Sequence, residues 1–219
     1  RWTIGPRRSS TPRPRTRAVR AGASKLLTAT VLGANGIASV PTFAEQQELP
    51  DIAGKWIVKP DDGAGCSRML ILEDAAATRA FLKTKIGWNL VAQPWLEGEP
   101  MSLSLLCAEG QARLLSINKQ FVSTGGGAPS LDSIFVNAQG DRDGVFAALG
   151  QRIAGVMTGL WGHVGVDLIV RGDQVTVLEV NPRVTTSYAG LTRALAINAA
   201  QLVLDLHRTG ALPARVPNS

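Results

Sequence analysis

The sequence contains little cysteine and no long apolar run. Cys66 and Cys107 lie far apart and form no CxxC pair, so neither a disulfide framework nor a cysteine zinc site is expected. No stretch approaches the ~20 apolar residues that span a bilayer, and no secretory signal precedes a cleavage site. These absences predict a cytoplasmic protein without a membrane partner.

Acidic residues are absent from positions 1–25, which hold 8 of the 23 Lys and Arg residues. The other 194 residues carry 15 basic and 17 acidic side chains, so the formal charge of +6 belongs to the N-terminal segment. A nucleic-acid site needs its positive charge on the folded body, so we expect no nucleic-acid partner. Residues 1–23, rich in Arg, Pro, Ser and Thr, predict an irregular tail, with a transit peptide as the alternative.

The segment 24–96 has the pattern of a first α+β lobe. Ser24 is a suitable N-cap for the first helix, and the two central strands form a hairpin around a glycine-containing loop. The expected elements are a helix over 25–34, strands over 55–60 and 69–72, a helix over 73–85 and a strand over 90–96.

The segment 97–210 predicts a second α+β lobe, followed by a C-terminal tail over 211–219. Its strands come in neighbouring pairs that turn at Glu109-Gly110 and at Gly172-Asp173. Antiparallel pairs between helices favour the α+β class over a doubly wound parallel sheet. The expected elements are strands over 101–107 and 111–122, a glycine-rich loop over 123–130, a helix over 142–160, strands over 162–170 and 174–180, and one helix over 189–207.

Three oxygen-bearing side chains lie near the last strand pair. Glu179 and Asn181 project to the same face of their strand, about 7 Å apart. Asp167, in the preceding strand, lies opposite Glu179 only if the connection has an odd length or one strand carries a bulge. Carboxylate and amide oxygens suit Mg²⁺, with Mn²⁺ as an alternative. Solvated carboxylates on an exposed sheet face are the competing interpretation. His163 shares the alternation of Asp167 and is interpreted as a structural histidine.

Two further segments resemble parts of a nucleotide site. Lys59 ends a strand before the loop of Gly63, Ala64, Gly65, Cys66 and Ser67, whose backbone N–H groups could close around phosphate oxygens. Residues 93–99 run from a strand into a turn, and such a strand end can hold an adenine. An ordinary hairpin turn and an ordinary linker are the alternatives for these two segments.

In this order the motifs resemble the ATP-grasp superfamily, in which two α+β lobes with mainly antiparallel sheets hold ATP between them. The resemblance covers roughly residues 25–207 and rests on Lys59-Pro60 with its loop, on residues 95–99 and 165–168, and on residues 179–183. Within the superfamily, residues 125–129 and 181–188 resemble the group that contains tyramine–L-glutamate ligase.

The resemblance implies a role for each matching position. Lys25 and Lys59 would approach the α- and β-phosphates, and Lys119 the γ-phosphate. The loop of Gly63, Ala64, Gly65, Cys66 and Ser67 would form a lid. The nucleoside would contact Gln93, Trp95 and Leu96 at adenine and Glu99 at ribose. Asp167, Glu179 and Asn181 would hold Mg²⁺, and Arg183 would stabilise the carboxylate or its acyl phosphate.

The implied activity is an ATP-dependent ligase that joins a small-molecule carboxylate, such as glutamate or another amino acid, to an amine in cofactor biosynthesis. Two departures matter. Gly165 stands where D-alanine ligases have an arginine, and the usual N-terminal α/β domain has no counterpart in this chain, which begins at Arg1 and could be a fragment. A nucleotide-binding module without turnover and a nucleic-acid binder acting through the tail are the alternatives. The oligomeric state stays open, and a homodimer is compatible with the sequence.

Overall fold

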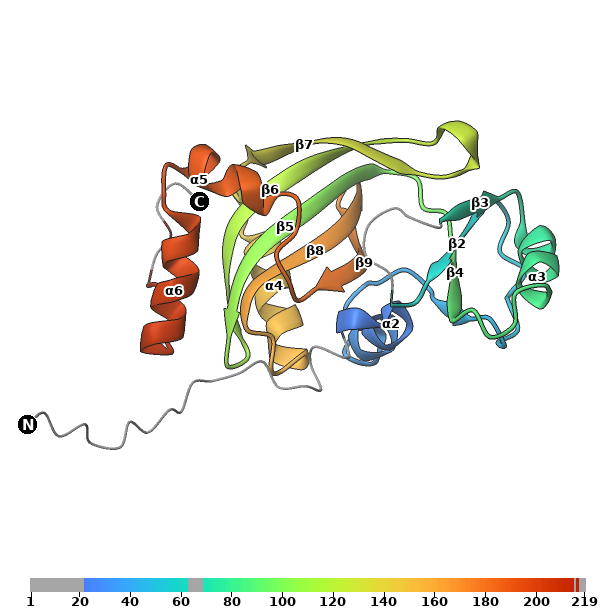
Figure 1. Cartoon of the computed structure of the whole chain (residues 1–219), viewed down its shortest axis with the longest axis horizontal. Coiled ribbons are helices and arrows are strands. Elements are labelled where there is room, and N and C mark those ends of the chain that lie inside the picture. The colour runs from blue at the N-terminus through green and yellow to red at the C-terminus, as the bar shows by residue number, and fades with distance from the viewer. Residues whose placement is uncertain (1–21, 63–68, 215, 217–219) are drawn as a thin grey trace, which may run out of the picture.

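The computed structural model describes residues 22–62, 69–214 and 216, and it contains two antiparallel sheets with helices around them (Figure 1). This arrangement confirms the predicted α+β class. The helices are α2 (Lys25–Ala34), α3 (Ala75–Lys83), α4 (Val145–Val156), α5 (Tyr188–Leu195) and α6 (Ala199–Thr209), with a 3-10 turn η1 (Gly125–Gly127). The strands are β1 (Phe43–Ala44), β2 (Trp56–Pro60), β3 (Leu70–Leu72), β4 (Leu90–Pro94), β5 (Glu99–Ala108), β6 (Gln111–Ser123), β7 (Ser130–Gln139), β8 (Gly162–Arg171) and β9 (Gln174–Asn181).

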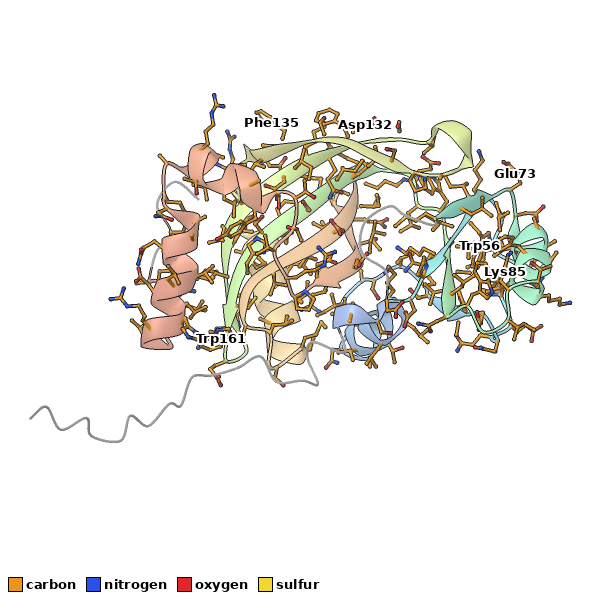
Figure 2. The ribbon with its side chains drawn as sticks, viewed as in Figure 1. Trp56, Glu73, Lys85, Asp132, Phe135 and Trp161 are labelled. Atoms are coloured by element: carbon orange, nitrogen blue, oxygen red, sulfur yellow. The ribbon has the colours of Figure 1, made fainter. Side chains whose placement is uncertain are left out.

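The smaller sheet has the strand order β1-β4-β2-β3, and α3 packs against it (Figure 1). The predicted hairpin is present, because Trp56 pairs with Leu72 and Val58 with Leu70 in antiparallel register. Trp56 is fully buried in this core (Figure 2), which also contains Leu82 of α3. Asp74 accepts a hydrogen bond from the Ala77 N–H at 2.7 Å and so begins α3.

The larger sheet has the order β7-β6-β5-β8-β9 and is antiparallel throughout. Alternate residues of β5 and β8 face α4 and α2, where Leu103, Val166 and Ile153 are fully buried. The other face is covered by α5 and α6 at one end, and its remaining part faces the smaller sheet. Cys107 is fully buried in this core, and burial raises the pKa of its thiol to about 12.

Helix α2 precedes the smaller sheet in the sequence but packs against the larger one. Its Ser24 cap is confirmed, since the Leu27 N–H donates to Ser24 Oγ at 3.1 Å. Leu32 belongs to the core beneath β8 and β9, and the backbone at Ser39 bridges to Val177. The structure therefore places this part of the segment 24–96 with the larger sheet.

The largest differences from the sequence-based expectations are at β7 and at the C-terminal helix. Strand β7 was not predicted, because as an edge strand it is paired on one side only and all ten of its residues are partly or fully exposed. The single C-terminal helix expected over 189–207 is two helices. Ala196 adopts a left-handed conformation with φ of 54°, and Asn198 caps α6 by accepting the Gln201 N–H at 3.0 Å.

Candidate functional site

Asp167 and Glu179 are directly opposite one another on β8 and β9. The turn between these strands has only two residues, Gly172 and Asp173, so the odd connection we considered is wrong. The alternative, a bulge, is confirmed: Asp167 pairs with Glu179 while Leu168 pairs with Val177, which leaves Leu178 as an extra residue. The bulge shifts the alternation of β9 by one position and so brings both carboxylates to the same face.

Asp167 lies where its charge is disfavoured. Burial, followed by the neighbouring Glu179 carboxylate, raises its pKa from 3.8 to about 6, although Gln120, Lys59 and Arg183 act in the opposite direction. Gln120 Nε2 donates to Asp167 Oδ1 at 2.9 Å, and Asn181 Nδ2 donates to Oδ2 at 2.9 Å. The carboxylate is thus held in a fixed orientation by two amides at a place where a cation would stabilise it.

Two buried lysines, Lys25 and Lys59, lie close to this pair of carboxylates. Lys25, with 3% of its surface exposed, places Nζ 3.5 Å from Glu179 Oε1 and donates to the Asp61 carbonyl at 3.2 Å. Lys59, with 5% exposed, lies at the end of β2 and lines the cavity described below. Phosphate oxygens are strong acceptors for ammonium groups of this kind, so both lysines suit a phosphate-bearing ligand.

Arg183 follows β9 and is oriented by its own neighbourhood. Its Nη2 donates to Asn181 Oδ1 at 3.0 Å, and its Nη1 donates to the Val184 carbonyl at 3.3 Å. The Arg183 carbonyl accepts a hydrogen bond from His163 Nδ1 at 3.1 Å, so the expectation of a hydrogen-bonded histidine is met. Asn181 therefore connects Asp167 to Arg183 through its two amide atoms.

A cavity of roughly 440 Å³ lies between the two sheets, within the size range of small-molecule sites. Its lining includes the predicted adenine residues Gln93, Trp95 and Leu96, and it also includes Asp167. The apolar part of the lining includes Val40, Ile57, Met69, Pro94, Ile169 and Leu178, and the polar part includes Lys59, Ser102, Gln120, Asp167, Glu179, Asn181, Arg183, Thr185, Thr186 and Ser187.

The family follows from comparison with known proteins. The family model described as ATP-grasp domain matches residues 22–187. This chain belongs to the ATP-grasp family. The resemblance drawn from the sequence motifs is thereby confirmed, and the strand order and the cavity between the sheets can be read as those of an ATP-grasp domain.

Curated relatives point to one group within the ATP-grasp family. Tyramine–L-glutamate ligase of Methanocaldococcus jannaschii is 32% identical over 108 residues, which are 47% of this chain and 32% of the relative. The enzyme of the same name from Methanocaldococcus fervens is 30% identical over 142 residues, which are 63% of this chain and 40% of the relative. The aligned parts thus make up less than half of the length of these relatives.

Solved ATP-grasp structures share the fold at low identity. L-amino acid ligase from Bacillus licheniformis superposes with a TM-score of 0.68 at 19% identity over 88% of this chain and 49% of that one. N5-carboxyaminoimidazole synthetase from Staphylococcus aureus, solved with ADP, gives a TM-score of 0.74 at 17% identity over 90% and 54%. No helix in the described part of the chain is long and apolar enough to cross a membrane.

Two residues predicted for the ATP-grasp site lie elsewhere. Ser102 pairs with both Asp167 and Asn118, so the even positions of β5 and β6 share the face of Asp167. Glu99 and Lys119 occupy odd positions and therefore project from the opposite face, where they form an ion pair with each other. Neither lines the cavity, so the geometry gives no support to the ribose role of Glu99 or the γ-phosphate role of Lys119.

The predicted lid of Gly63, Ala64, Gly65, Cys66 and Ser67 lies outside the described residues. Trp95 is described and lines the cavity, and its backbone N–H donates to the Lys55 carbonyl at 2.8 Å. Its indole Nε1 donates to Glu97 Oε1 at 3.0 Å.

Several residues of the site were missed from the sequence. Gln120 and Glu97 line the cavity. The sequence motifs predicted their neighbours instead, Lys119 next to Gln120 and Glu99 two positions after Glu97. Gly165 was noted as a departure from D-alanine ligases, and the structure shows what occupies the space: a Cβ at this position would lie 2.5 Å from Thr185 Cγ2. Residues 185–187 thus fold back over β8 and line the cavity.

The donor set fits a divalent cation. Asp167 and Glu179 contribute two carboxylates, hard ligands of the kind that Mg²⁺ and Mn²⁺ accept, with phosphate oxygens and water completing the coordination. Asn181 now turns its Nδ2 toward Asp167 and its Oδ1 toward Arg183, so its oxygen would reach the same cation after its side-chain amide turns over. Among the described residues no three His, Cys, Asp or Glu side chains gather. Burial and the neighbouring Glu179 raise the pKa of Asp167, and a bound cation would stabilise the charged form of its carboxylate.

Proposed function

We propose that this chain is the nucleotide- and metal-binding part of an ATP-dependent ligase that joins a carboxylate to an amine through an acyl phosphate. The observation that carries the proposal is the pairing of Asp167 with Glu179 across the β9 bulge, next to two buried lysines and to Arg183. A cavity whose lining combines apolar residues with charged side chains suits a nucleoside triphosphate, which has an apolar base and a charged tail.

In the proposed reaction, an oxygen of the substrate carboxylate forms a bond to the γ-phosphorus of ATP. The bond between that phosphorus and the β,γ-bridging oxygen breaks, and ADP leaves. The amine nitrogen then bonds to the acyl carbon, the bond from carbon to the phosphate oxygen breaks, and phosphate leaves as the amine proton passes to it or to water. No side-chain nucleophile is needed, because the domain acts by positioning and by charge.

Each group of residues has a distinct task in this proposal. Asp167, Glu179 and Asn181 would hold Mg²⁺, which when bound would offset the charge of the phosphates. Lys25 and Lys59 would contact the phosphates, and Lys59 is already in the cavity. Arg183 would bind the carboxylate and then the acyl phosphate. The polar side chains of residues 185–187 would bind the rest of the carboxylate substrate.

The substrates are proposed from the relatives. Both curated relatives are named for L-glutamate and tyramine, so we propose an amino acid such as glutamate as the carboxylate and cofactor biosynthesis in the cytoplasm as the setting. A second candidate is a nucleotide-binding module without turnover. In that case the cavity between the sheets would bind ATP without transfer of a phosphoryl group.

The decisive experiment measures ADP and hydroxamate formation. The chain is incubated with ATP, Mg²⁺, L-glutamate and hydroxylamine, a small amine that converts acyl phosphates to hydroxamates. We expect ADP release that requires both the carboxylate and Mg²⁺. Glu179→Gln should abolish it, whereas Asp173→Asn, an exposed position in the turn of the same hairpin, should not. ATP binding without ADP in any mixture of amino acids and amines would favour the module and overturn the ligase.

A further inference from the structure

Thr42 lies next to the cavity between the sheets without lining it. It directly precedes β1, and because Phe43 of β1 pairs with Ala92 of β4, Thr42 lies beside Gln93. Gln93 Nε2 donates to Thr42 Oγ1 at 2.9 Å, and Thr42 Oγ1 in turn donates to the Val40 carbonyl at 3.0 Å. Thr42 thus holds a side chain that belongs to the wall of the cavity.

This pair of hydrogen bonds fixes the orientation of the Gln93 amide. A hydroxyl has one proton, and the proton of Thr42 is used on the Val40 carbonyl, which only accepts. Toward Gln93 the hydroxyl oxygen can therefore only accept, so the side-chain amide presents its NH₂ group to Thr42. The amide oxygen, Oε1, is consequently directed away from Thr42.

The Oε1 atom of Gln93 is open to the cavity. Gln93 lines the cavity although only 2% of its surface is exposed. Within the described part of the chain Oε1 accepts no hydrogen bond, and His163 Nε2 is the one side-chain nitrogen or oxygen that is both closed to solvent and unpartnered. Solvent therefore reaches Oε1, and for this buried residue the solvent is that of the cavity. Gln93 offers an acceptor to whatever binds there.

Strand geometry places this acceptor at some distance from Lys59. Gln93 pairs with Ile57 of β2, and both residues line the cavity. Lys59 projects to the same side as Ile57, about 7 Å further along the strand. In the opposite direction the lining continues with Trp95 and Leu96. A nucleotide whose phosphates contact Lys59 and whose base follows β2 would bring that base to Gln93.

The two purine bases differ in the group that such an acceptor would meet. Adenine carries an amino group on C6, which donates, whereas guanine carries an oxygen there, which accepts. Against Gln93 Oε1 adenine gains a hydrogen bond, and guanine places two acceptors together in a largely buried place. An amide turned the other way would favour guanine instead. The orientation of one amide therefore decides between the two bases.

We propose that Thr42 is a positioning residue that makes the proposed nucleotide site select adenine over guanine, by holding the Gln93 amide with its oxygen toward the base. The inference rests on the proposed function, because it concerns the choice of nucleotide at the same site. Thr42 acts through Gln93 and contacts no substrate. Its loss changes the ratio of the two affinities, whereas a general loss of structure at this edge would weaken both nucleotides alike.

Calorimetric titration with adenylyl and guanylyl imidodiphosphate, both with Mg²⁺, measures this ratio. The wild-type chain should bind the adenine analogue at least tenfold more tightly, as expected when a buried acceptor is satisfied by one base only. Thr42→Val keeps the shape of the side chain but removes the hydroxyl, and should lower the ratio of the affinities at least fivefold. Thr42→Ser keeps the hydroxyl and should hold the ratio within twofold of the wild type.

Two further variants show whether Thr42 acts through the amide. Gln93→Met removes the amide and should lower the ratio by itself, and adding Thr42→Val should then change it less than twofold. Thr84→Val is the matched control. It removes a hydroxyl that donates to the Phe81 carbonyl at the end of α3, away from the cavity lining, and should leave the ratio within twofold of the wild type.

The outcomes separate this inference from the proposed function. Equal binding of the two analogues by the wild type, an unchanged ratio in Thr42→Val, or a ratio that falls as far in Thr42→Ser would overturn the role of Thr42. Hydroxamate formation with ATP would still report on the ligase in each of these cases. Loss of hydroxamate formation in the wild-type chain, with the base selectivity and its dependence on Thr42 retained, would overturn the ligase and leave the selection of adenine.

Discussion

Replacing Asp167 by asparagine removes the carboxylate whose charge is disfavoured in the metal-free protein. The native group binds its proton with a pKa of about 6, against an ordinary value of 3.8. Because the native state holds a proton that the unfolded chain has already released between pH 4 and pH 6, the stability of the metal-free protein falls as the pH rises through this window. At ~1.4 kcal/mol per pKa unit, the loss from this group is roughly 3 kcal/mol by pH 8.

The pH slope is a better measure than the absolute stability of the variant. Gln120 and Asn181 both donate to Asp167, so an asparagine amide would meet one donor with another until Gln120 turns its side chain. The rearrangement of Gln120 lowers the stability of Asp167→Asn by the same amount at every pH. This cost therefore cancels when the change in stability with pH is compared between the wild type and Asp167→Asn.

The assay is urea unfolding in EDTA at several pH values between 4 and 8. We expect the free energy of unfolding of the wild type to fall by about 2–3 kcal/mol relative to Asp167→Asn over this range. Mg²⁺ with an ATP analogue at pH 8 should stabilise the wild type more than the variant, because the metal binds the native state only. Parallel pH profiles for the two proteins would refute the reasoning about Asp167.

Three further predictions follow from the cavity and its walls. Lys59→Met should weaken binding of an ATP analogue at least tenfold in a calorimetric titration, because Lys59 is buried and lines the cavity. Glu97→Gln should weaken the same binding more than Glu99→Gln, since Glu97 lines the cavity and Glu99 pairs with Lys119 on the opposite face; the reverse order would restore the ribose role of Glu99. Gly165→Ala should lower the free energy of unfolding by about 1–3 kcal/mol because its Cβ would lie 2.5 Å from Thr185 Cγ2, and adding Thr185→Ser should recover part of the loss.

The parts of the fold that the sequence predicted have strong local signals. Alternating apolar residues and glycine turns located the hairpins of β5 with β6 and of β8 with β9, and Ser24 marked the beginning of α2. Strand β7 has a weak alternation because it is an edge strand. The break at Ala196 has neither glycine nor proline to mark it, although Asn198 is an N-cap that could have indicated a second helix.

The sequence predicted which residues lie together at the site better than it predicted how they are arranged. Asp167, Glu179, Asn181 and Arg183 are together as the motifs implied, but the bulge at Leu178 that brings the carboxylates to one face has no sequence signature of its own. The position of Lys119 on the opposite face of the sheet from Asp167 could have been predicted from the sequence. It lies two positions after Ile117, a core residue, and the alternation of a strand puts both on the face that points away from Asp167.

A crystal structure of the chain with a non-hydrolysable ATP analogue and Mg²⁺ tests the central claim most directly. We expect the metal to be bound by Asp167 and Glu179, with the phosphates against Lys59 and the adenine at the strand end that contains Trp95. Metal density away from Asp167, Glu179 and Asn181, or a nucleotide outside the cavity between the two sheets, would contradict the account.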